Sequence, residues 1–334
     1  MDERVIVTRE PLNAETPLDR QLGLVTPAGR HYVRTHFGIP AAPSSLAVGG
    51  TVERPFEVSL EELAGLPSRS LLVTLECAGN GRAFLDPPAP GEPWRLGAVG
   101  TAEWTGAPLA ALLERARPRR ETIEVLFRGA DRGPLPHGKL ASYERSLPLG
   151  RARDEDVLVA YAMNGEPLPP EHGAPFRLVV PGWYGMAAVK WLAEIIAIDV
   201  PFGGFYQADR YVIGDQPLRA IRTRAVIVAP RDGERHSRER MEVRGYAWSG
   251  EAPIARVALS TDGGATWRDT RLGPAVARHA WREWRLDWTP ERSGAHTLIA
   301  RATDAAGAEQ PLAQRRNVLG YANNAAQPTR LIID

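Results

Sequence analysis

A short apolar run that ends in a glycine-rich turn constrains this chain more than any other stretch. Residues 71–82 read LLVTLECAGNGR, and the opening LLVTL has the composition of a buried β-strand. The Ala-Gly-Asn-Gly segment that follows Cys77 cannot continue a strand, so a turn is expected there. Loops that follow strands are where α/β proteins place binding and catalytic side chains. The sequence therefore predicts a functional loop around Cys77.

Cys77 is the single cysteine among 334 residues, which excludes an internal disulfide. Three roles are then open, namely a small core residue, a nucleophile, or a thiolate ligand of a metal. A free cysteine is most often part of the core. The glycines of the turn and the nearby Arg82, whose cation favours a thiolate, shift the balance toward chemistry.

Composition limits the classes of protein that this chain can belong to. Hydrophobic residues make up 43% and charged residues 24%, as in globular proteins, and the length suits two domains. A net charge of +1 provides no basic field, so neither nucleic acid nor an anionic membrane is an expected partner. No apolar run reaches the roughly 18 residues of a membrane span, and the first residues lack the pattern of a signal peptide. We expect a cytoplasmic protein; a periplasmic one would require that a signal had been removed.

The pattern along the chain predicts an α+β protein with an N-terminal arm and two domains. Residues 1–30 are polar and interrupted by prolines, which indicates an arm packed on the surface. Residues 31–207 mix helix and strand patterns, whereas residues 218–334 contain short strands separated by turns, as in a β-sandwich. Within the second domain, residues 257–267 predict a hairpin with a glycine turn.

Two elements of the first domain bear on the candidate site. Residues 107–116 predict an amphipathic helix, and residues 122–127 predict a buried strand that ends at Arg128 and Gly129. Asp131 would then lie in the turn after this strand. It is either an ordinary turn residue or a carboxylate that contacts a ligand.

Several short segments resemble known motifs when they are read together, in order along the chain. They are residues 32–40, 76–82, 160–169, 172–182, 189–192 and 209–211. Their order and spacing resemble the sulfite oxidase family of molybdopterin-dependent oxidoreductases, of the bacterial type without a haem domain. The resemblance covers nearly the whole chain. It implies a mixed α/β molybdopterin-binding catalytic domain over residues 31–207 and an immunoglobulin-like domain over residues 218–334 that forms a homodimer.

The resemblance implies molybdenum and molybdopterin as cofactors, with Cys77 as the protein ligand of the metal. Soft sulfur donors suit a metal that changes oxidation state. Arg177 also has support from the residue pattern, because a guanidinium in an apolar strand needs an anionic partner. The implied cofactor-binding residues are Tyr32, Arg34, Thr35, His36, Asp131, His172, Arg177, Ala188, Val189 and Lys190.

The same resemblance implies a small oxyanion substrate, held by Arg34 and Arg82 and oriented by Tyr211. Guanidinium groups suit such anions. Leu319 stands where sulfite oxidases carry a further arginine and where the related nitrate reductases carry an apolar residue. Oxidation of sulfite to sulfate and reduction of nitrate or a sulfoxide-type substrate are therefore both open. Because the chain has no Cys-x-x-Cys-His haem motif, we expect a separate electron acceptor, a cytochrome or another molecule.

Two alternatives of another class remain on the residues alone. A cofactor-free binding module built from the same two domains would contain no metal. A cysteine hydrolase would need a base beside Cys77, and His172 is the available candidate. Metal analysis separates both alternatives from the oxidoreductase.

Overall fold

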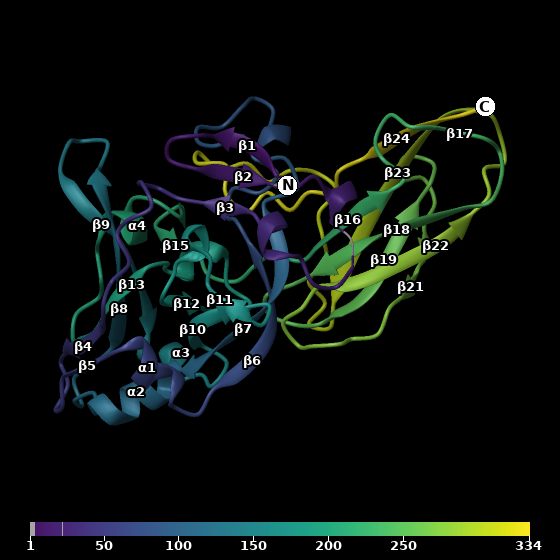
Figure 1. Ribbon diagram of the computed structural model, residues 1–334. Coiled ribbons are helices and arrows are strands. Elements are labelled where there is room, and N and C mark those ends of the chain that lie inside the picture. Colours follow the sequence, from purple (N-terminus) through teal and green to yellow (C-terminus); the bar gives the residue numbers. More distant parts are fainter. Residues whose placement is uncertain (1–3, 22) are drawn as a thin grey trace.

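The structure, a computed structural model, describes residues 4–21 and 23–334 and shows a mixed α/β lobe joined to a β-sandwich (Figure 1). This is the α+β architecture that the sequence predicts. Two five-stranded sheets form most of the mixed lobe, and a small three-stranded sheet lies beside them. The small sheet consists of β1 (Val5–Thr8), β2 (Asn13–Glu15) and β3 (Val33–Arg34).

One five-stranded sheet carries the strand that leads to Cys77. Its order is β11-β10-β7-β6, with β12 also paired to β10. Its strands are β6 (Arg69–Glu76), β7 (Val99–Pro108), β10 (Leu158–Met163), β11 (Glu166–Pro167) and β12 (Arg177–Val179). β6 pairs antiparallel with β7 up to the pair Glu76 and Val99, so the strand ends one residue before Cys77. The predicted strand followed by a turn is confirmed.

The other five-stranded sheet corrects the prediction for Asp131. Its order is β5-β4-β13-β8-β9. Its strands are β4 (Leu46–Gly50), β5 (Phe56–Val58), β8 (Glu124–Pro134), β9 (Leu140–Pro148) and β13 (Leu192–Ile198). β8 does not end at Gly129 but continues to Pro134, and its register with β9 shifts between Arg128 and Arg132. Asp131 therefore lies in a β-bulge and not in a turn, because the glycines around it permit the bulge without ending the strand.

The helices are short. The predicted helix forms as α2, with Leu109, Leu112 and Leu113 on its buried face. The others are α1, which starts with a capping box of Ser59 and Glu62, and two single-turn helices. The α-helices are α1 (Leu60–Ala64), α2 (Leu109–Ala116), α3 (Leu149–Ala152) and α4 (Phe205–Ala208). Within residues 4–21 and 23–334, no helix has both the length and the apolarity that a membrane crossing requires.

The N-terminal segment packs on the mixed lobe through buried polar side chains, and residues 1–3 and 22 lie outside the described residues. Asn13 and Glu15, both buried in β2, accept hydrogen bonds from backbone groups of other segments. Asn13 Oδ1 accepts from Thr35 N at 2.9 Å, and Glu15 accepts from Arg95 N and Gly97 N, each at 2.9 Å. These polar side chains are buried because they satisfy donors of loops that would otherwise remain unpaired.

The second domain is a β-sandwich, as predicted. One sheet has the order β16-β18-β22-β21 and the other β17-β24-β23-β19-β20. β19 (Ile254–Ser260) pairs antiparallel with β20 (Arg268–Asp269), and Gly263 and Gly264 have positive φ in the loop between them, which confirms the hairpin. The remaining strands are β16 (Arg224–Ala229), β17 (Arg235–His236), β18 (Met241–Trp248), β21 (Arg271–Leu272), β22 (Arg282–Trp288), β23 (Gly294–Asp304) and β24 (Thr329–Ile333).

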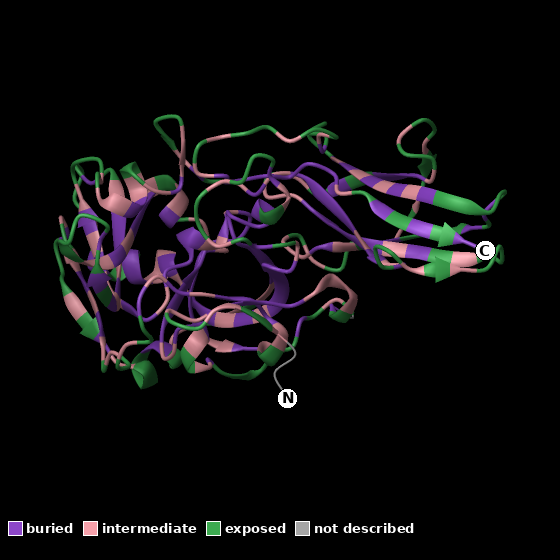
Figure 2. Cartoon of the chain, turned by 90° about the horizontal axis from the view of Figure 1, so that it is seen from above, coloured by how far each residue is buried: buried purple, intermediate pink, exposed green. Residues whose placement is uncertain are grey.

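Buried residues continue from the mixed lobe into its joint with the sandwich (Figure 2). Trp281 lies at this joint, where its backbone N donates to Thr74 Oγ1 of β6 at 2.7 Å and its indole Nε1 donates to Leu24 O at 2.9 Å. The ring of Tyr246 stacks on Trp281 with 4.3 Å between centroids. The two domains therefore share a packed, hydrogen-bonded interface.

Candidate active site

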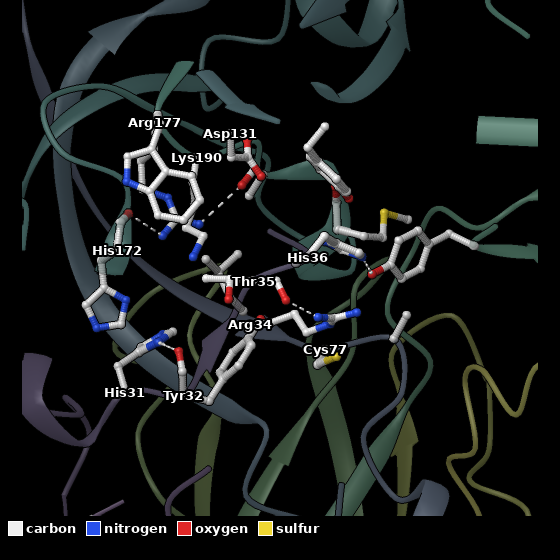
Figure 3. A pocket seen from close by; sticks show the side chains of 18 residues that line it. His31, Tyr32, Arg34, Thr35, His36, Cys77, Asp131, His172, Arg177 and Lys190 are labelled. Carbon is white, nitrogen blue, oxygen red and sulfur yellow. Dashed lines mark hydrogen bonds between the residues drawn. The ribbon is translucent and has the colours of Figure 1, made fainter. Parts of the chain in front are cut away.

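A cavity lies at the end of β6, where segments far apart in the chain meet (Figure 3). Cys77 lies in its wall with Arg34, His36, Asp131 and Arg177. The full lining is His31, Tyr32, Arg34, Thr35, His36, Leu75, Cys77, Ala78, Asp131, Tyr143, His172, Arg177, Gly185, Met186, Ala188, Lys190, Trp191 and Tyr211. The structure thus brings together most of the residues that the sequence had singled out.

The turn after β6 fixes Cys77 in the cavity wall. Cys77 N donates to Ala98 O at 2.9 Å, and Cys77 O accepts from Asn80 N at 2.9 Å. Gly81 has a φ of +85°, which few side chains tolerate, so the glycine is needed for the turn. Burial raises the pKa of the Cys77 thiol, and the positive charge of Arg34 offsets only part of this effect. The thiol is therefore protonated at neutral pH and would lose its proton when a metal binds.

The hydrolase alternative finds no support in this geometry. His172 Nε2 lies 3.1 Å from Ala28 O and so is not paired with the thiol. In Figure 3, His172 and Cys77 lie at opposite ends of the cavity. A base hydrogen-bonded to the nucleophile, which such a mechanism needs, is not present in the described part of the chain.

A metal at Cys77 would need most of its ligands from outside the protein. In residues 4–21 and 23–334, no three His, Cys, Asp or Glu side chains gather to hold a metal ion. A single protein thiolate suits a metal whose remaining sulfur donors belong to an organic cofactor. The donor set therefore fits molybdopterin better than a metal ion held by the protein alone.

Arg177 provides an anion site at the end of the cavity away from Cys77. Its Nη1 donates to His172 O at 3.0 Å and its Nη2 to Ala188 O at 3.4 Å, and its Cζ lies 4.5 Å from the centroid of the Trp104 ring. None of the described carboxylates forms an ion pair with it, and burial lowers the pKa of Arg177 to about 10. A buried cation with only neutral partners is a strong site for an anionic group of a ligand.

Two neutral imidazoles lie beside Arg177. The rings of His31 and His172 meet edge to face with 5.3 Å between centroids. Burial lowers the pKa of His31 to about 3 and that of His172 well below its usual value, so neither ring is charged at neutral pH. His31 Nε2 is buried and has no hydrogen-bond partner. His31 was not predicted as a site residue, although it directly precedes the segment 32–40 that resembles a family motif.

Asp131 and Lys190 are two further polar residues in the cavity wall. Asp131 Oδ1 is buried without a partner, and burial raises the pKa of Asp131 to about 6 against the opposing effect of Lys190. Lys190 Nζ donates to Glu171 O at 2.8 Å, and burial lowers the pKa of Lys190 well below its usual value. Unpaired buried polar atoms are rare in folded proteins, so those of His31 and Asp131 indicate hydrogen bonds to a ligand.

The other end of the cavity, near Cys77, contains Arg34. Its Nη1 donates to Asn13 Oδ1 at 3.1 Å and to Thr35 O, and its Nη2 forms an ion pair with Glu92 Oε2 at 3.3 Å. Burial lowers the pKa of Arg34, but Tyr211, Glu92 and Cys77 together outweigh it and raise the pKa above its usual value. Arg34 is thus charged at all relevant pH values. Its partner Glu92 was not predicted from the sequence.

Tyr211 and His36 are hydrogen-bonded to each other. Tyr211 Oη lies 2.7 Å from His36 Nε2, and the Tyr211 ring stacks on Tyr321 with 5.0 Å between centroids. Burial raises the pKa of Tyr211 and lowers that of His36, so both groups are neutral at pH 7, and the tautomer of the imidazole determines which of the two donates. Tyr143, which the sequence analysis did not select, stacks on His36 at 4.7 Å.

Two predicted residues do not line the cavity. Arg82 donates to Glu92 O at 2.8 Å and to Leu319 O at 3.3 Å, and so it connects the loop of Glu92 to that of Leu319. The guanidinium of Arg82, which was expected to bind an oxyanion, is therefore bound to backbone carbonyls outside the cavity lining. Val189 packs its side chain into the core, while its carbonyl accepts from Leu178 N. The neighbours of Val189, Ala188 and Lys190, do line the cavity.

Comparison with known proteins identifies two family models in the chain. The oxidoreductase molybdopterin binding domain matches residues 36–206, and the Mo-co oxidoreductase dimerisation domain matches residues 216–327. The first match contains Cys77, Asp131 and Arg177. Tyr211 lies between the two matches.

Several known proteins are similar over nearly the whole chain. Mitochondrial sulfite oxidase of Rattus norvegicus is 33% identical over 96% of this chain and 64% of its own length. Sulfite oxidase of Gallus gallus is 34% identical over 91% and 72%, and NADH nitrate reductase of Ulva prolifera is 30% identical over 97% and 42%. The crystal structure of the sulfane dehydrogenase SoxCD from Paracoccus pantotrophus covers 98% of this chain and 87% of its own, with a TM-score of 0.86 and 30% identity.

The chain therefore spans about 64% of the length of the mitochondrial relative. The matched domains agree with a cavity in which a buried thiol, an unpaired arginine and unpaired polar atoms fit a molybdenum cofactor. On this evidence the chain belongs to the sulfite oxidase family of molybdopterin-dependent oxidoreductases.

Proposed function

We propose that this protein oxidises a small sulfur oxyanion such as sulfite and passes the electrons to a separate acceptor. The observation that carries the proposal is that Arg34 and Tyr211 line the same cavity wall as the thiol of Cys77. A permanent cation and a protonated phenol beside the metal ligand suit an anionic substrate. The similarity to sulfite oxidases at 33–34% identity supports this substrate class.

In this proposal the two ends of the cavity have different tasks. Cys77 would hold the molybdenum, while Arg177, His172, His31 and Lys190 would hold the anionic and polar edges of molybdopterin. When bound, the cofactor supplies a metal centre that takes up an electron pair and transfers an oxygen atom. Ala188 lies between these groups, and its carbonyl fixes the guanidinium of Arg177.

The chain's own residues would bind and orient the substrate. Arg34 would hold the oxyanion, but its ion pair with Glu92 means that the substrate must compete with a built-in carboxylate. With the His36 tautomer that carries a proton on Nε2, His36 would donate to Tyr211 Oη across the 2.7 Å contact. The phenol proton of Tyr211 would then be free to hydrogen-bond the substrate. Arg82 would act indirectly, because its hydrogen bond to Glu92 O holds the loop that carries the competing carboxylate.

Reduction of nitrate is a second candidate, and Leu319 is the observation that favours it. By the resemblance, Leu319 replaces an arginine that would lie near the substrate. Without that arginine, Arg34 would be the cation nearest to Cys77 in the lining, and Arg34 already pairs with Glu92. The similarity to NADH nitrate reductase at 30% identity agrees with this alternative. We also propose a homodimer, because residues 216–327 match a dimerisation domain.

Steady-state kinetics would test the proposal. The purified protein is assayed for molybdenum, for sulfite oxidation with an artificial electron acceptor, and for nitrate reduction with a reduced dye. We expect about one molybdenum per chain and turnover with sulfite that exceeds turnover with nitrate. Cys77→Ser should remove the activity together with the metal. Molybdenum-loaded protein that is inactive on sulfite but active on nitrate would refute the sulfite proposal, and metal-free protein would refute both.

A further inference from the structure

The β-sandwich reaches into the turn that carries Cys77. Glu76, the last residue of β6, is 2% exposed although it is charged. Its Oε1 forms an ion pair with Arg224 Nη1 of β16 at 3.0 Å, and its Oε2 accepts from Trp248 Nε1 of β18 at 2.9 Å. Both partners belong to the part of the chain that matches a dimerisation domain.

Asn80, on the other side of the turn, also contacts Glu76 and Arg224. Asn80 Nδ2 donates to Glu76 Oε1 at 3.0 Å, and Asn80 Oδ1 accepts from Ala98 N at 3.2 Å. Asn80 N donates to Cys77 O, and Asn80 O accepts from Arg224 Nη2 at 3.4 Å. Cys77 is therefore enclosed between Glu76 and Asn80, and both of these residues bind the same guanidinium of the sandwich.

The C-terminal part of the chain attaches the turn at two more points. Ala322 N donates to Ala78 O at 2.7 Å, and Asn323 Nδ2 donates to Gly81 O at 2.9 Å. The carbonyls of Ala78, Asn80 and Gly81 thus all accept from donors that lie beyond residue 223. These contacts bind backbone groups of the turn itself, so they determine where the turn lies relative to the sandwich.

We propose that the sandwich domain has a second role beside dimerisation: it positions the sulfur of Cys77, with Glu76 and Arg224 as the positioning residues. A buried ion pair adds little stability, because both charges lose their contact with water. Its fixed geometry can instead hold the surrounding backbone in one conformation. Here that arrangement is the end of β6. The inference rests on the proposed role of Cys77 as the metal ligand.

Labelling of the thiol tests this in cofactor-free protein, because Cys77 is the only cysteine and its reaction with a thiol reagent reports the turn alone. Glu76→Gln leaves Arg224 without its ion-pair partner, so the double variant Glu76→Gln/Arg224→Met, which leaves no unpaired charge, is made beside it. Thr74→Val is the matched control, since it removes two hydrogen bonds at the same joint and on the same strand, one with Trp281 N and one with Thr101 Oγ1.

We expect the double variant to label about tenfold faster than the wild type or more, which corresponds to about 1.4 kcal/mol, at an unchanged denaturation midpoint. Thr74→Val should label within about twofold of the wild type, because the loss of hydrogen bonds at the joint that do not involve the turn leaves the turn in place. Equal labelling of the double variant and the wild type, or an equal rise in Thr74→Val, would overturn the inference.

A second measurement examines the loaded protein. The electron paramagnetic resonance signal of the reduced molybdenum should change its g-values in the double variant and keep them in Thr74→Val. Unchanged g-values in the double variant would contradict the positioning role. Absence of molybdenum from the wild type would refute the proposed function, whereas the labelling comparison alone decides whether the sandwich positions Cys77.

Discussion

Two buried arginines of this protein should respond in opposite ways to the same substitution. Arg177 and Arg224 are 5% and 3% exposed. Arg224 faces the carboxylate of Glu76 at 3.0 Å, whereas Arg177 has only carbonyl partners and the ring of Trp104. In cofactor-free protein, Arg177→Met should therefore increase the free energy of unfolding and Arg224→Met should decrease it.

The magnitude for Arg177 follows from its pKa. Burial lowers this pKa from 12.5 to about 10, and at about 1.4 kcal/mol per pKa unit the buried charge costs about 3 kcal/mol. Methionine removes that cost but loses the hydrogen bonds to His172 O and Ala188 O, at about 1 kcal/mol each, and the long one from Nε to Leu178 O at 3.5 Å, at about 0.5 kcal/mol. The net gain is about 0.5 kcal/mol. The cost is fully present below pH about 10 and disappears as pH rises toward the ordinary pKa, because the folded state releases its proton first.

The comparison variant leaves a buried carboxylate without its cation. Breaking a buried ion pair by removal of one partner costs about 3–5 kcal/mol, and Glu76 keeps only the hydrogen bonds from Trp248 and Asn80. Arg224→Met should lower the unfolding free energy by roughly this amount.

Urea unfolding at pH 8, followed by tryptophan fluorescence on cofactor-free samples, measures both variants. Molybdenum content after reconstitution should fall sharply in Arg177→Met, because the anion site has lost its cation. A decrease in stability for Arg177→Met as large as that for Arg224→Met would show that Arg177 is a structural residue, and the assignment of this end of the cavity to an anion would be wrong.

Three further substitutions test individual residues of the cavity. In cofactor-free protein, the free energy of unfolding should depend on pH because the pKa of Asp131 is about 6 in the folded state and 3.8 ordinarily. Wild-type stability should therefore fall by about 3 kcal/mol between pH 4 and 7, and Asp131→Asn should remove this fall. A wild-type stability that does not change over this pH range would contradict the prediction. Glu92→Gln should lower KM for sulfite about tenfold and leave kcat within twofold, because the substrate no longer has to displace the Glu92 carboxylate from Arg34. A tenfold change corresponds to about 1.4 kcal/mol of binding free energy. An unchanged KM would show that Glu92 does not compete with the substrate. Tyr211→Phe should lower kcat by about tenfold or more, as is typical of a lost proton donor, and a stopped-flow rate equal to the wild type would exclude this role.

Local patterns in the sequence predicted the parts of the fold that depend on neighbouring residues. The strand and turn around Cys77 follow from an apolar run and adjacent glycines, and the hairpin of β19 and β20 follows from Gly263 and Gly264. The bulge at Asp131 has the same local signal as a turn, because glycine permits both. Only the pairing of β8 with β9 on both sides of the bulge distinguishes them.

The partners of the charged side chains could not be predicted in the same way. Arg82 and Arg34 both lie in segments that resemble family motifs, yet Arg82 points to backbone carbonyls and Arg34 to Glu92. A long flexible side chain chooses its partner from groups that tertiary structure brings near, and sequence distance does not report these. The buried polar residue Asn13 was missed for the same reason, since its donors lie more than twenty positions away at Arg34 and Thr35.

Under the proposed function, the two ends of the cavity would suit ligands with different residence times. At the far end, Arg177 has no carboxylate partner, and so the full attraction between guanidinium and anion is available to a bound group. Near Cys77, Arg34 already has Glu92 at 3.3 Å, so an incoming anion gains only the difference between two similar ion pairs. An unpaired buried cation favours a cofactor that stays, whereas a cation with a built-in competitor favours a substrate that binds and a product that leaves. In the proposed function, the distribution of carboxylates, more than the number of arginines, would therefore separate the cofactor end from the substrate end.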